Sequence, residues 1–202
     1  MKALVRGLFF ASAVLLAGSV SFAQGTLTLN AVNPAAPTQT KVLIINDNGG
    51  GDIIGSYTVN GFPSEIQATF NANDLTIQIG SESSFLTKSL SGSETVYSGN
   101  LASNNATITE TIKKSDKSLI DGTIGTITDL SGKTKNERRV VLHWNDKDIL
   151  LKAKSGGACS GTLKSGKDIL LTFNCTSSGT LVDALISNPD HTIGFLINLF
   201  VR

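Results

Sequence analysis

The strongest constraint on the fold of this chain is a repeated alternation of apolar and polar residues within 138–175. Successive side chains of a β-strand point to opposite faces, so alternation of this kind predicts strands with one buried face. Four such runs are separated by segments rich in turn-forming residues, at 145–147, 155–157 and 165–166. Because strands joined by such short connections pair antiparallel, the whole stretch is predicted to form a meander.

Similar runs occur along most of the remaining chain. No segment shows a convincing helical period, although 181–186 fits one or two helical turns. The last segment, 191–202, is predicted to be a strand because its apolar residues alternate: Ile193, Phe195, Ile197, Leu199 and Val201. About ten short strands without intervening helices predict an all-β fold, an antiparallel meander that forms a β-sandwich or an up-and-down β-barrel.

Both cysteines lie in the meander at positions that we expect to face the core. Cys159 shares parity with Leu163, and Cys175 shares parity with Phe173. A three-residue turn would set Cys175 diagonal to Cys159, near the largest separation that a disulfide spans, and a bulge or a longer turn would bring the two together. We predict a Cys159–Cys175 disulfide, which stabilises the fold by about 3 kcal/mol if its geometry is unstrained. The alternative is a pair of buried free thiols.

Residues 1–23 have the organisation of a secretory signal peptide. Lys2 and Arg6 precede an apolar run over 8–20, and 21–23 form a small-x-small cleavage site that places the mature start at Gln24. The run is shorter than the ~20 apolar residues of a transmembrane anchor. Ser19 stands where a lipoprotein signal needs cysteine, so we expect an unlipidated protein, secreted or periplasmic. An oxidising compartment of this kind permits the disulfide.

The mature chain, 24–202, is predicted to form a single all-β domain of nearly neutral charge. Removing residues 1–23 leaves 15 basic residues against 16 acidic ones. A chain this balanced has no strong field to attract nucleic acid or an anionic membrane. We therefore expect no nucleic-acid partner and no segment that spans a membrane.

Two groups of residues have the chemistry of catalytic or metal sites but lack the required context. Segment 157–161 places Cys159 as in a nucleophile elbow, but a predicted strand follows where that motif needs a helix. His143 and His191 are the only histidines, and neither has the short ligand spacing of a zinc site with Cys159 or Cys175. We expect both histidines at strand ends or turns, and we predict no catalytic residue, metal site or cofactor.

Two polar segments are candidate ion sites. The loop 46–52 carries oxygen ligands and three glycines, but it lacks the acid spacing of a calcium-binding loop, so a hairpin turn is the better interpretation. Lys133, Lys135, Arg138 and Arg139 form one basic cluster. We interpret this cluster as part of a solvated, charged loop over 131–137 and its flank rather than as an anion site.

These observations favour a non-enzymatic exported β-domain that acts as a binding or surface-interaction module. Its partner is an unknown protein, a glycan or a small apolar ligand. The alternative is a closed β-barrel that carries a small apolar ligand in its cavity. An outer-membrane barrel and a secreted hydrolase are further alternatives, and the scarcity of Trp and Tyr weighs against the former.

Overall fold

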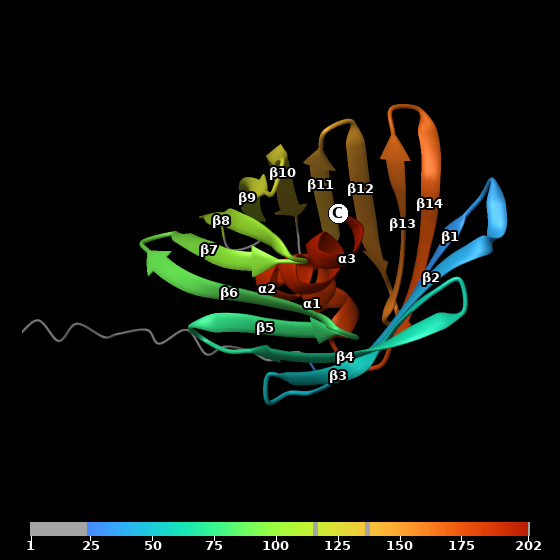
Figure 1. Cartoon of the computed structure of the whole chain (residues 1–202), viewed down its shortest axis with the longest axis horizontal. Helices are drawn as coiled ribbons and strands as arrows, with labels where there is room; N and C mark the ends of the chain where they lie inside the picture. The colour runs from blue at the N-terminus through green and yellow to red at the C-terminus, as the bar shows by residue number, and fades with distance from the viewer. Residues whose placement is uncertain (1–23, 115–116, 136–137, 202) are drawn as a thin grey trace, which may run out of the picture.

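The computed structural model describes residues 24–114, 117–135 and 138–201, and its strands form one closed barrel (Figure 1). Each strand pairs antiparallel with its neighbours in sequence, and the first pairs with the last. The strands are β1 (Gln24–Asn33), β2 (Ala36–Asn48), β3 (Asp52–Val59), β4 (Phe62–Phe70), β5 (Asp74–Ile79), β6 (Glu82–Ser91), β7 (Glu94–Leu101), β8 (Asn104–Lys114), β9 (Lys117–Ile124), β10 (Ile127–Lys135), β11 (Arg139–Trp144), β12 (Lys147–Lys154), β13 (Ala158–Ser165) and β14 (Asp168–Ser177).

The antiparallel all-β meander is therefore confirmed, and the barrel is the correct one of its two predicted forms. The β-sandwich is wrong, and the expected count of about ten strands is too low, since the described residues form fourteen. The predicted signal peptide, 1–23, lies outside the described residues. No described helix is long and apolar enough to cross a membrane.

The chain ends in a helical segment, whereas the sequence predicted a final strand over 191–202. The helices are α1 (Leu181–Ser187), α2 (Pro189–His191), the π-helix η1 (Thr192–Ile197) and α3 (Asn198–Phe200). The expected helical turn at 181–186 is confirmed by α1. Asn188 caps α2 by accepting a hydrogen bond from the Asp190 amide, and Pro189 takes the first helical position, which suits its fixed φ.

This helical segment fills the barrel. We call residues 181–201 the C-terminal plug, and every residue from 191 to 201 is buried. Figure 1 shows the helices inside the ring of strands. Barrels of about eight strands are just narrow enough for wall side chains to fill, so a wider barrel needs further material inside. The plug supplies it, and its apolar residues join those of the wall in one core.

The wall alternates as its sequence predicts. In β4, Ile66, Ala68 and Phe70 are buried inside the barrel, and Glu65 and Gln67 between them are exposed. The same alternation holds in the meander 138–175, where the four predicted strands are β11 to β14.

One close contact between plug and wall depends on glycine. A Cβ on Gly194 of η1 would lie 2.6 Å from the Cζ atom of Phe70. Phe70 is itself held between plug side chains, with ring centroids 5.1 Å from His191 and 5.5 Å from Phe195. Gly194 therefore lets the plug backbone approach the wall of β4.

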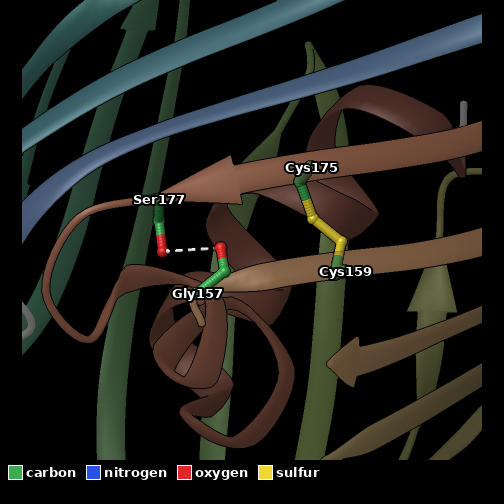
Figure 2. The surroundings of a disulfide bond; sticks show 4 residues. All are labelled: Gly157, Cys159, Cys175 and Ser177. Atoms are coloured by element: carbon green, nitrogen blue, oxygen red, sulfur yellow. Dashed lines mark hydrogen bonds between the residues drawn. A yellow bond between two sulfur atoms is a disulfide. The ribbon is translucent and has the colours of Figure 1, made fainter. Parts of the chain in front are cut away.

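The predicted Cys159–Cys175 disulfide is present in the structure (Figure 2). Cys159 of β13 lies directly opposite Cys175 of β14, and their Cα atoms are 4.8 Å apart. The turn has two residues, with Ser165 opposite Asp168, and a register shift follows between Leu163 and Lys164; together they move the pair from the diagonal to the opposed position. Of the two predicted alternatives, a bulge or a longer turn, the structure has the register shift and not the longer turn. Near the end of the same hairpin, the Ser177 amide donates to the Gly157 carbonyl at 2.6 Å.

Candidate functional site

The two ends of the barrel differ because the plug begins at one end and finishes toward the other. It enters beside β1, where the Thr180 amide donates to the Gln24 carbonyl at 3.0 Å. We call this end, with the turns 49–51 and 155–157, the entry rim. The opposite end, with the turns 60–61, 80–81 and 145–146, is the mouth rim. The plug ends with Phe200 edge-on to Phe173 and Tyr57, at ring-centroid distances of 5.2 and 6.5 Å.

Asp190 fixes the plug to the wall. One carboxylate oxygen accepts a hydrogen bond from Lys88 Nζ at 2.8 Å, and the other accepts from the Tyr97 hydroxyl at 2.9 Å. The side chains of Lys88 and Asp190 are only 9% and 13% exposed, so water screens this ion pair weakly. Burial, together with the carboxylates of Asp190 and Glu110, raises the pKa of Tyr97 far above its ordinary value. The Tyr97 hydroxyl therefore stays protonated and donates a hydrogen bond to Asp190.

Glu110 is the second carboxyl group of this cluster, after Asp190, and it lies buried in the wall. Burial raises the pKa of Glu110, the Ser118 hydroxyl opposes that shift by hydrogen bonding, and the charge of Asp190 adds to it. Burial and a neighbouring negative charge both favour the protonated form of a carboxyl group, so they act in the same direction on Glu110.

A second contact joins the plug to β2. His191 Nε2 lies 3.5 Å from Asp47 Oδ2, and both side chains are buried. Asp47 Oδ1 accepts from the Gly49 amide at 2.7 Å, so this carboxylate also shapes the turn that follows β2. Two contacts thus connect α2 to the wall: Asp47 of β2 contacts His191, and Lys88 of β6 pairs with Asp190. Their geometry is that of an anchor for the plug.

The mouth rim contains a hollow lined by residues of the wall and of the plug. Its volume is about 400 Å³, and residues of α3 form its floor. Its apolar lining consists of Tyr57, Val59, Ile79, Leu199 and Phe200. We call this hollow the mouth pocket.

Charged groups border the mouth pocket on two sides. Lys41 of β2 and Glu82 of β6 both line it. Lys41 Nζ lies 5.6 Å from the ring centroid of Phe200, within range of a cation–π contact. Phe62, which faces Val59 across the β3–β4 hairpin, is 79% exposed at the same rim. A hollow with an apolar floor, two charges and an exposed aromatic neighbour has the composition of a ligand site.

The structure separates the other residues that the sequence singled out. Cys159 is disulfide-bonded and therefore carries no nucleophilic thiol. His143 is exposed on β11, where its Nδ1 lies 2.9 Å from Asp148 Oδ1, whereas His191 is buried in α2 rather than at a strand end or turn. Among the described residues, no three His, Cys, Asp or Glu side chains are placed to share a metal ion.

The loop 46–52 is the hairpin turn that we expected. Asp47 and Asn48 side chains accept hydrogen bonds from the amides of Gly49 and Gly50, at 2.7 and 2.8 Å, which is the geometry of Asx turns. The basic cluster differs from its prediction. Lys133 and Lys135 lie in β10 and Arg139 begins β11, so they belong to the barrel wall and not to a loop over 131–137.

Sequence reasoning missed the plug anchor and the mouth pocket. The signal for the anchor was local: Asn188-Pro189-Asp190 is a helix start, with a capping residue, proline at the first position and an acid in the first turn. The mouth pocket had no such signal, because its lining comes from five strands, the turn between β5 and β6, and the plug.

Fold and pocket together define a class of protein, a closed and internally plugged all-β barrel with a hollow at its mouth. Comparison of the chain with models of protein families, with curated proteins and with solved structures finds no match. The functional assignment therefore depends on the geometry of this chain alone.

Proposed function

We propose that the protein is an exported, non-enzymatic binding module that presents its mouth pocket to a ligand or to a group on a larger partner. The observation that carries this proposal is the filled barrel. Because residues 191–201 are buried inside the wall, the interior is a rigid support, and the mouth pocket is a hollow that remains above the plug at that end. Binding sites built on rigid elements hold their geometry at low entropic cost.

The outer face of the wall supports a barrel that faces water. Exposed residues of β4 and β5 include Glu65, Gln67, Thr69, Thr76 and Gln78. A barrel in an outer membrane carries an apolar outer band and a polar interior, which is the reverse arrangement. The disulfide at Cys159 and the separation of the two histidines by the barrel wall support a binding role over hydrolysis.

A carrier of a small apolar ligand is the second candidate, and the floor of the mouth pocket favours it. Tyr57, Leu199 and Phe200 offer apolar surface, and a volume of about 400 Å³ lies within the range of small-molecule sites. In such a carrier the ligand occupies the mouth and not the centre of the barrel, because the plug occupies the centre.

Native mass spectrometry of the protein from its own exported fraction, without detergent, tests both candidates. A mass of a few hundred daltons that is lost on denaturation supports the carrier and supplies the compound to identify. A bare mass, two daltons below that of the reduced chain, supports a module that meets a larger partner.

A pair of variants then locates the binding site. Ser64→Trp fills the mouth pocket from β4, and Thr58→Trp places the same side chain at an outward position of β3 near the same rim. We expect the first variant to lose the bound compound, or the partner captured by the wild type, and the second to retain it. Equal binding by both variants would contradict the mouth pocket as the site.

A further inference from the structure

The outer wall near the entry rim carries three cations at directly opposed positions. Lys135 of β10 lies opposite Arg139 of β11, and Arg139 lies opposite Lys152 of β12. All three are exposed. Neighbouring strands lie ~4.8 Å apart, so the three side chains begin within about 10 Å of one another. We call these three residues the cation row.

Repulsion among the three like charges of the cation row lowers the stability of the barrel. Like charges at directly opposed positions of neighbouring strands destabilise a sheet. Within the described part of the chain, none of the three is in a salt bridge. The described acids on β10 to β12 lie toward the mouth end: Asp148 contacts His143, and Asp129 accepts a hydrogen bond from the Asn145 amide.

A hollow lies beside the row. Its volume is about 120 Å³, and it is lined by Lys133, Lys135, Arg139 and Val141. Lys133 lies two residues from Lys135 on the same outer face of β10. A hollow this small with three cations on its walls suits one tetrahedral oxyanion, which an arginine guanidinium contacts through two N–H groups and lysines contact as point charges.

We propose that the cation row and this hollow bind an anionic polysaccharide through its sulfate or phosphate groups, at a site separate from the mouth pocket. The row extends across the strands, so it engages consecutive charged groups of a chain, and the hollow receives one of them. Each contact releases counterions, which makes the binding strongly dependent on salt.

The surroundings favour a glycan over other polyanions. The large apolar residues exposed in the described chain lie on β3, β4, β6, β8 and β14, and none is on β10 to β12: Ile54, Phe62, Phe85, Leu90, Ile112 and Ile169. The row therefore has no adjacent apolar anchor for a bilayer and no exposed aromatic ring on which nucleobases stack. A polysaccharide needs neither.

The test is the affinity of the mature chain for heparin, as a sulfated polysaccharide, across a series of salt concentrations. The variant Lys135→Gln/Arg139→Gln/Lys152→Gln removes the row. The variant Lys113→Gln/Lys164→Gln/Lys167→Gln changes the net charge equally on other strands and turns. Loss of three contacts weakens binding by roughly 100-fold at 0.15 M salt and flattens the salt dependence by about three ion equivalents.

We expect that loss in the row variant and less than about a three-fold loss in the control variant, since none of its lysines is directly opposite another on a neighbouring strand. The row variant should also unfold at the same temperature as the wild type or at a higher one, because the repulsion is relieved. Equal losses in both variants, or unchanged binding in the row variant, would overturn the proposal. Tighter row-dependent binding of a DNA duplex or of vesicles containing phosphatidylglycerol would overturn the choice of a glycan.

Discussion

Replacing Asp190 by asparagine should destabilise the barrel far more than an ordinary surface change. The substitution keeps the shape of the side chain but leaves Lys88, which is 9% exposed, without its counter-charge. Removing one partner of a buried ion pair costs about 3–5 kcal/mol, and we take the lower figure because both side chains retain some contact with water. In the wild type the Tyr97 hydroxyl donates to an Asp190 carboxylate oxygen at 2.9 Å. In the variant it meets a neutral amide instead, and the weaker hydrogen bond adds about 1 kcal/mol to the loss.

The expected loss in unfolding free energy is therefore about 3–4 kcal/mol. Urea unfolding of residues 24–202 measures it, with the fluorescence of Trp144, which is the only tryptophan and is buried in the wall. Lys88→Met/Asp190→Asn serves as the second variant of a double-mutant cycle. Because it removes both charges, it should recover at least about 2 kcal/mol of the loss. A loss below about 1 kcal/mol for Asp190→Asn, or no recovery in the double variant, would refute the anchoring role.

Three further predictions concern the same core. Because burial raises the pKa of Glu110, the folded state holds its proton to higher pH than the unfolded state does, so stability should fall as pH rises from the ordinary pKa of 4.5 through the raised value. Glu110→Gln should remove that fall in a series of unfolding curves, and a fall that persists would contradict this assignment. Gly194→Ala should destabilise by about 1–2 kcal/mol, since the overpacking against Phe70 exceeds the gain in helix propensity; Phe70→Leu should restore part of the loss, and its failure to do so would contradict the steric cause. Cys159→Ala/Cys175→Ala should cost about 3 kcal/mol in urea unfolding, and a loss below 1 kcal/mol would contradict the chain-entropy estimate.

The wall of the barrel could be predicted from sequence because its signal is local. In β5, for example, Leu75, Ile77 and Ile79 face the core and alternate with the exposed polar residues Thr76 and Gln78. The disulfide was predictable in its pairing but not in its register, because the bulge between Leu163 and Lys164 leaves no clear mark in the sequence.

The alternation is weak in part of the wall, although a strand forms there. Ser84 is buried although it is polar, and its hydroxyl accepts from the Ala102 amide at 2.8 Å, so β6 does not alternate cleanly. Closure of the barrel depends on the pairing of β1 with β14, which residues far apart in the sequence make. A local pattern carries no information on such a pairing.

The plug was predicted as a strand because its apolar residues alternate, but that alternation does not by itself distinguish a strand from a helix. Ile193, Phe195 and Ile197 alternate, yet Leu196 and Phe200 between and beyond them are apolar as well. A segment that is apolar on every side fits a fully buried helix as well as a fully buried strand. The choice depends on the space inside the barrel, which exists only once the wall has closed.

Hydrogen–deuterium exchange of residues 24–202 tests whether the C-terminal segment of this chain fills its own barrel. Peptides that cover residues 189–201 should exchange as slowly as peptides from β12 to β14, because their amides are buried behind a closed wall. Exchange of these peptides within seconds, while the strands stay protected, would mean that the segment lies outside the barrel and would contradict the account.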